Sequence, residues 1–149
     1  WSRGEHLSGF WIDKYPVTNA EYREFTAATG HTMPAHWLGT GENEGKVIFP
    51  KPKANHPVTF VTWEDAFTFA RWKGKRLPTS QEWEKAARGQ GGNIWPWGNV
   101  WDPEKANSSE SGHGDTTAVD QFKLGKSYYG VFDLVGNVWQ WCLDKVAPP

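Results

Sequence analysis

The strongest constraint on the fold of this chain is a helix-start signal that occurs three times. A threonine is followed three residues later by a carboxylate in TNAE (18–21), TWED (62–65) and TSQE (79–82). In such a capping box the threonine hydroxyl accepts a hydrogen bond from the third helical N–H, and the carboxylate accepts one from the N–H of the threonine. The pattern therefore predicts three helices, with Asp65 giving the shortest and weakest of the three boxes.

Each predicted helix is short and ends near a glycine. Gly30, Gly74 and Gly89 fit the left-handed backbone position that commonly follows a helix. Helical periodicity then predicts which side chains point inward. These are Tyr22 and Phe25 in the first helix, Trp63, Ala66, Phe67 and Ala70 in the second, and Trp83, Ala86 and Ala87 in the third.

Strand-like segments are also short and are separated by long irregular stretches. Aromatic and β-branched residues predict strands at 9–13, 57–61, 131–135 and 137–141. The stretches 31–55 and 89–126 are longer than ordinary connections, which is typical of functional, ion-ordered or disordered loops. The sequence has no internal repeat and no linker, so its 149 residues predict one α+β domain with extensive loops.

Charge and cysteine content exclude several classes of function. The 16 basic and 17 acidic residues are interspersed, which argues against a nucleic-acid or anionic-membrane partner. No run of about eighteen apolar residues occurs, so we expect a soluble chain. The single cysteine, Cys142, excludes an internal disulfide and a cysteine-based zinc cluster, and it slightly favours the cytoplasm. The five histidines have no metal-ligand spacing.

Five ordered motifs resemble those of one known family. They are YPVTN (15–19), PVTFVTWEDA (57–66), RLPTSQEWEKAARG (76–89), WPWG (95–98) and GVFDLVGNVWQW (130–141). Together they resemble the formylglycine-generating enzyme family, also called sulfatase-modifying factors. The resemblance implies a variant of the C-type-lectin-like α+β fold, in a single domain over residues 1–149 that lacks its C-terminal part.

The resemblance also implies an activity, but not its catalytic residues. Active members oxidise a cysteine of a client sulfatase to formylglycine with two cysteines that bind copper(I). Those cysteines belong to a C-terminal stretch that this sequence does not contain, so copper is expected only if a cysteine pair lies beyond residue 149. Cys142 follows the last motif directly and is expected to be a packed or idle thiol, because no histidine is near it in sequence.

Calcium is the second cofactor that the resemblance implies. One family site corresponds to Asp133, the carbonyls of Gly136 and Val138, and Gln140, where Gln140 replaces a glutamate and weakens the site. The other corresponds to Asn107 and the Ser108 carbonyl, with Asp115 as a displaced substitute for the family's aspartate. The alternative is that Asp115 is a turn residue and Asp133 a solvated carboxylate.

Two functions remain open on these grounds. The chain is either a formylglycine-generating oxidoreductase domain, or a non-catalytic C-type-lectin-like module that displays a binding surface for a protein or peptide ligand. The variable proteins of diversity-generating retroelements are an example of the second class. Among the 11 tryptophans, Trp63, Trp72, Trp83, Trp139 and Trp141 are expected in the core, and Trp37, Trp95, Trp97 and Trp101 in loops with exposed rings.

Overall fold

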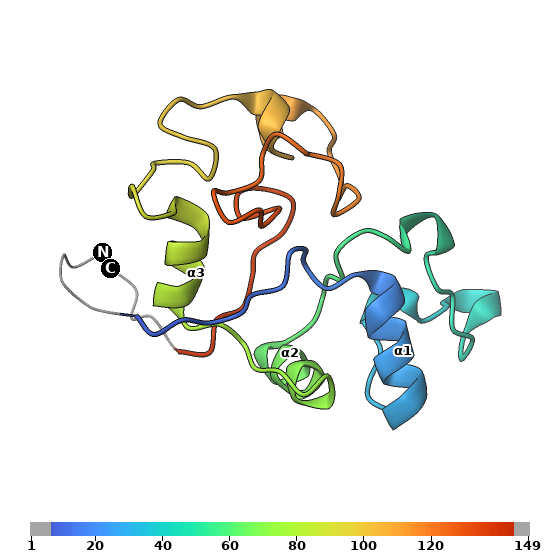
Figure 1. The fold of residues 1–149 in the computed structure, drawn as a ribbon. Helices are drawn as coiled ribbons and strands as arrows, with labels where there is room; N and C mark the ends of the chain where they lie inside the picture. The colour runs from blue at the N-terminus through green and yellow to red at the C-terminus, as the bar shows by residue number, and fades with distance from the viewer. Residues whose placement is uncertain (1–6, 145–149) are drawn as a thin grey trace.

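The computed structural model describes residues 7–144 and contains three short α-helices joined by long loops (Figure 1). Helices α1 and α2 are in contact, and α3 lies apart from them beside the C-terminal loop segments. Short 3-10 helices lie within the loops between and after the α-helices. The elements are α1 (Asn19–Thr29), η1 (Ala35–Trp37), η2 (Gly41–Asn43), η3 (Lys51–Lys53), α2 (Trp63–Trp72), α3 (Ser80–Arg88), η4 (Pro103–Lys105) and η5 (Ser109–Ser111).

The three predicted capping boxes are confirmed. At α1 the Thr18 hydroxyl accepts from the Glu21 N–H at 3.2 Å, and Glu21 Oε2 accepts from the Thr18 N–H at 2.9 Å. The aspartate box of α2 also closes, with Asp65 Oδ2 accepting from the Thr62 N–H at 2.8 Å. The box at α3 has the same two bonds. Each helix therefore begins at its predicted residue because its first orphan N–H groups are satisfied locally.

The helix ends agree with the sequence apart from a small shift in α2. Gly30 caps α1 with φ 71°, and Gly89 follows α3 with φ 65°. In α2 the cap is Lys73, and the left-handed Gly74, with φ 69°, comes one residue later. The glycines thus stop the helices where a side chain would strain the backbone.

The four predicted strands are wrong. Within residues 7–144 the backbone forms no strand and only three isolated bridges, Thr18 with Pro57, Leu38 with Val47, and Trp95 with Gly98. Left-handed residues interrupt the strand-like segments: Phe60 has φ 57°, Asp133 has φ 53° and Asn137 has φ 62°. Such residues cannot continue an extended ladder. The helices and loops of the predicted α+β domain are confirmed, and the sheet of a C-type-lectin-like fold is not.

Two clusters of buried side chains hold the elements together. Tyr22, Phe25, Trp37 and Phe69 form the first, between α1, η1 and α2. The Tyr22 and Phe69 rings stack at a centroid distance of 5.7 Å, and Phe25 meets Phe69 edge to face at 5.5 Å. Both arrangements are favourable for aromatic pairs. Periodicity had predicted Phe67 among the inward residues of α2, whereas Phe69 is buried and Phe67 is half-buried and stacks on Trp63.

The second cluster joins α3 to the last motif of the chain. Ala86 and Ala87 of α3 pack against Val131 and Leu134, with Trp83 covering one side. Small alanine side chains allow the loop to approach the helix closely. This packing fixes the loop that carries Asp133, so α3 positions the candidate site.

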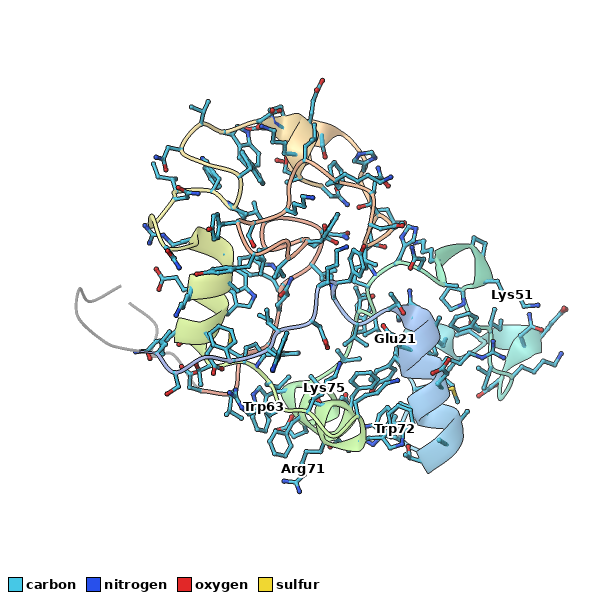
Figure 2. All side chains as sticks on the ribbon, viewed as in Figure 1. Glu21, Lys51, Trp63, Arg71, Trp72 and Lys75 are labelled. Atoms are coloured by element: carbon cyan, nitrogen blue, oxygen red, sulfur yellow. The ribbon has the colours of Figure 1, made fainter. Side chains whose placement is uncertain are left out.

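The division of the tryptophans into buried and exposed residues differs from the prediction. Trp37 is completely buried, at 0% exposure, although it was expected in an exposed loop. Trp139 is fully exposed, at 102%, although it was expected in the core. Trp95, Trp97 and Trp101 pack on one another and are half-buried, and are thus less exposed than predicted. Trp72 and Trp141, also predicted in the core, are 38% and 49% exposed. Figure 2 shows Trp63 and Trp72 on opposite sides of α2, and Trp72 contacts Phe25 of α1 at a centroid distance of 5.5 Å.

An ion pair beside α3 leads to the first prediction. Glu82 is 9% exposed, and its two oxygens accept from Arg76 at 2.7 Å each. These bonds, with the N–H of Thr79, hold the pKa of Glu82 at about 2, against 4.5 in a free side chain. Because the folded-state pKa is lowered, this stabilisation is complete above about pH 4.5 and is lost as the pH falls toward 2. Allowing for the solvent around half-exposed Arg76, we expect a loss of about 2 kcal/mol.

Urea unfolding at several pH values measures this effect. Glu82→Gln keeps the shape of the capping box, and we expect it to be less stable than the wild type at pH 7 with a flatter dependence between about pH 5 and 3. Equal losses of stability in the two proteins over that range would show that Glu82 is not the responsible group.

Candidate functional site

The predicted site residues lie on two loops that meet face to face. One loop, 107–117, follows η4 and includes η5, and the other, 133–140, begins within the segment packed on α3. The backbone N–H of Asn137 donates to the carbonyl of Asn107 at 2.9 Å. Gly136 allows this approach, since a Cβ at that position would lie 2.4 Å from the Asn107 oxygen. We call this meeting point the loop junction.

Asn137 is the residue that joins the two loops. Its Oδ1 accepts from the Thr117 N–H at 3.0 Å, and its Nδ2 donates to the Thr117 carbonyl at 3.1 Å and to Asp133 Oδ2 at 2.8 Å. The sequence reasoning missed this role. The Gly-Asn pair at 136–137 was the available signal, because asparagine tolerates the left-handed backbone that a tight loop requires.

Asp133 is buried at the centre of the loop junction. Its exposure is 7%, and its backbone is left-handed. Burial, with a smaller contribution from the charge of Asp120, raises the pKa of Asp133 to about 6, while the hydrogen bond from Asn137 acts in the opposite direction. The alternative of a solvated Asp133 carboxylate is therefore excluded.

Gln140 makes two hydrogen bonds that fix its amide orientation. Its Oε1 accepts from the indole N–H of Trp83 at 2.8 Å, and its Nε2 donates to the carbonyl of Asp133 at 2.6 Å. An indole N–H only donates, so the oxygen must face Trp83. The amide thus turns its nitrogen, rather than its oxygen, toward the loop, and this orientation does not fit a calcium ligand.

The remaining predicted ligands do not all converge. Asn107 donates to the Asp115 carbonyl at 2.8 Å, so these two lie together. The Asp115 carboxylate is more than half exposed and is paired with Lys53 Nζ at 2.5 Å, which lowers its pKa. The Ser108 carbonyl accepts from Ser111 Oγ at 2.8 Å, and the Gly136 carbonyl accepts from the Val138 N–H at 2.8 Å. These two carbonyls are thus engaged in local turns.

The copper chemistry of the family does not fit the described residues. Cys142 is half-buried, and burial followed by the charge of Asp144 raises its thiol pKa, which disfavours a thiolate. Across residues 7–144, no three His, Cys, Asp or Glu side chains are placed to hold a metal ion.

An exposed aromatic surface lies beside Cys142. The Trp63 indole donates to the Cys142 carbonyl at 2.8 Å, and the Trp141 indole donates to the Val61 carbonyl at 3.1 Å. These bonds place the segments 60–63 and 141–142 side by side. Phe60 is 79% exposed and Trp141 is 49% exposed. We call Phe60, Trp63 and Trp141 the aromatic surface.

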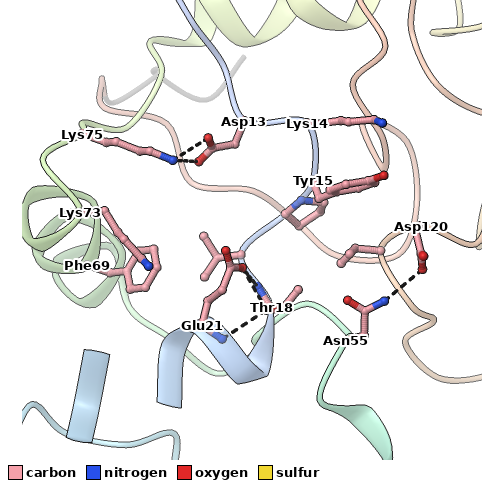
Figure 3. A pocket seen from close by; sticks show the side chains of 13 residues that line it. Asp13, Lys14, Tyr15, Thr18, Glu21, Asn55, Phe69, Lys73, Lys75 and Asp120 are labelled. Atoms are coloured by element: carbon pink, nitrogen blue, oxygen red, sulfur yellow. Dashed lines mark hydrogen bonds and ion pairs between the residues drawn. The ribbon is translucent and has the colours of Figure 1, made fainter. Parts of the chain in front are cut away.

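A polar cavity of about 360 Å³ opens between α1, the end of α2 and the segment before α1 (Figure 3). Figure 3 shows each carboxylate of the lining bonded to a neighbouring residue. Intramolecular pairing leaves the cavity without a free carboxylate for a ligand. Its carboxylates are those of Asp13, Glu21 and Asp120, which accept from Lys75, Thr18 and Asn55 respectively.

The helices between residues 7 and 144 are all too short or too polar to cross a bilayer. Comparison with known families then identifies the chain. The model of the Sulfatase-modifying factor enzyme 1-like domain matches residues 2–148. The chain therefore belongs to this family, as its motifs had indicated.

Individual relatives extend this result. The chain is 32% identical to the formylglycine-generating enzyme of Streptomyces coelicolor, over 95% of this chain and 60% of that protein. It is 32% identical to the inactive C-alpha-formylglycine-generating enzyme 2 of Mus musculus, over 93% of this chain and 59% of that protein. It is 37% identical to the uncharacterized protein YfmG of Bacillus subtilis, over 94% of this chain and 34% of that protein. The chain thus spans about a third to three fifths of their lengths.

Proposed function

We propose that this chain is a formylglycine-generating-enzyme-like domain that binds a protein or peptide client at its aromatic surface. The observation that carries the proposal is the exposed Phe60 and Trp141 on a chain whose sequence follows formylglycine-generating enzymes almost throughout. Indole rings fixed by hydrogen bonds to backbone carbonyls, as those of Trp63 and Trp141 are, offer a large apolar area at little cost in side-chain entropy.

The backbone at Phe60 supports this assignment. A bulky residue with φ 57° is strained, and such strain persists where the surrounding structure imposes it, often at a functional position. The ring gains no contact with the buried clusters in return, since it is largely exposed and, among residues 7–144, its one ring contact is a tilted one with His36 at a centroid distance of 5.1 Å. Contact with a bound client would account for a strained residue whose ring is exposed.

The client proposal has a direct chemical test. In active members of the family, a client cysteine in a Cys-x-Pro-x-Arg segment becomes formylglycine with copper(I) and oxygen. The protein is incubated with such a peptide, copper(I) and oxygen, and mass spectrometry follows conversion of the thiol to the aldehyde. Conversion supports an oxidoreductase; a peptide that binds and stays unchanged supports a binding domain.

A non-catalytic display module is the second candidate. The similarity to an inactive relative and the single half-buried thiol favour it. Both candidates share the aromatic surface, so they are separated by conversion of the peptide and not by its binding. Failure of a Cys-x-Pro-x-Arg peptide and of its serine analogue to bind at all would remove the client proposal in both forms.

The aromatic surface yields a prediction in which binding and stability change independently. Phe60→Gly removes the ring and also relieves the left-handed strain. We therefore expect unchanged or slightly higher stability, by up to about 1 kcal/mol, with peptide affinity at least about tenfold weaker. Fluorescence anisotropy of a labelled peptide and thermal unfolding measure the two quantities.

Val100 supplies the matched control. It is as exposed as Phe60, at 79%, but lies on the segment between α3 and η4. Val100→Ser should leave peptide affinity unchanged. Wild-type affinity in Phe60→Gly would contradict the assignment of this surface.

A further inference from the structure

The way the two loops are joined at the loop junction is independent of client binding. Calcium joins loops by attracting several oxygen atoms to one point, so each ligand must present an oxygen lone pair there. At this junction several of the oxygen atoms are instead matched by N–H donors of the chain itself. Asn137 Nδ2 donates to Asp133 Oδ2 at 2.8 Å and to the Thr117 carbonyl at 3.1 Å.

Gln140 completes this pattern. Its Nε2 donates to the Asp133 carbonyl at 2.6 Å, and Trp83 keeps the amide from rotating because its indole N–H requires the oxygen. A glutamate at position 140 would still accept from Trp83. It would present its second oxygen to the Asp133 carbonyl, where two oxygens need a cation between them.

The second candidate loop shows the same replacement. The Asp115 carboxylate is paired with the Lys53 ammonium at 2.5 Å and with the Thr116 N–H at 2.7 Å. The Asp115 carbonyl accepts from Asn107 Nδ2 at 2.8 Å. An intramolecular cation and an amide donor thus already satisfy the oxygens of this residue.

We infer that the loop junction is held without a metal: the Gln140 amide, clamped by Trp83, bridges to the Asp133 carbonyl in the place where a cation would join the oxygens. The loops are then ordered at any calcium concentration. A single change of amide to carboxylate at position 140 converts this self-supported junction into one that depends on calcium.

Thermal unfolding of the full chain tests the inference, first in chelator and then with excess calcium. The calcium concentration is set about a hundredfold above the weakest calcium dissociation constant that the experiment is meant to detect. We expect the wild-type melting temperature to be the same in both. We expect Gln140→Glu to melt at least about 4 °C lower in chelator and to recover most of the difference with calcium, but not with magnesium.

Gln140→Met is the matched control. It has nearly the same size and removes both hydrogen bonds without adding a charge, so its melting temperature should fall and should not respond to calcium. A wild-type melting temperature that rises with calcium would overturn the inference. So would Gln140→Glu melting like the wild type in chelator, since the amide would then carry no part of the junction.

Discussion

Trp37→Ala is expected to lower the free energy of unfolding by about 3–5 kcal/mol, the largest effect of any single substitution proposed for this chain. Trp37 is 0% exposed and packs edge to face against Tyr22 and Phe49, at centroid distances of 6.2 Å and 5.2 Å. Removing the indole leaves a cavity between α1 and η1 that the short surrounding elements cannot fill. Urea unfolding followed by circular dichroism measures the loss.

Trp37→Phe separates the cavity from the polar atom. The indole Nε1 of Trp37 is buried and has no hydrogen-bond partner among the residues that the structure describes. A buried orphan donor costs about 1–3 kcal/mol, so its removal offsets part of the lost packing. We expect Trp37→Phe to lose less than half as much stability as Trp37→Ala. Equal losses would show that the indole N–H finds a partner in solution.

Gly136→Ala is expected to lower the free energy of unfolding by about 3 kcal/mol. The new Cβ would lie 2.4 Å from the Asn107 carbonyl oxygen, a backbone atom that cannot move without breaking its bond from the Asn137 N–H. The left-handed φ of 77° adds about 1–2 kcal/mol of strain for any residue with a Cβ. The loops should separate, which hydrogen exchange at the Asn137 and Thr117 amides detects.

Gly130→Ala isolates the contribution of the backbone angle. Gly130 has a similar φ of 80°, but a Cβ there would meet no atom within 4 Å. We expect a loss of only about 1–2 kcal/mol and unchanged exchange at the loop junction. If the two alanine variants were equally destabilised, the close approach of Gly136 to Asn107 would not contribute.

Much of the helical structure could be predicted because its signals are local. A capping box couples a threonine to a carboxylate three residues away, and both bonds form within one helical turn, as at Thr18 and Glu21. The prediction therefore needed no knowledge of the rest of the fold. It erred where the tertiary environment decides, as when Phe69 rather than Phe67 entered the core.

The strand predictions failed because the alternation of side chains is only one of two requirements for a strand. The other requirement is a neighbouring strand that hydrogen-bonds to the backbone. The left-handed backbone at Phe60, Asp133 and Asn137 prevents such a regular ladder. The predictions of which tryptophans are buried failed for a related reason. Their composition indicated aromatic clusters, but the burial of Trp37 and the exposure of Trp139 depend on which loops cover them.

The sequence by itself determined the family, the three helix starts and the single cysteine within these 149 residues, because motifs, capping pairs and composition are properties of neighbouring residues or of simple counts. Only the tertiary structure decided how the candidate site is built. Trp83 and Gln140 are 57 positions apart, and Lys53 and Asp115 are 62 apart. Whether such groups meet depends on how distant segments pack against one another, as Gly136 does against Asn107. A short stretch of sequence does not determine the spatial distance between residues so far apart along the chain.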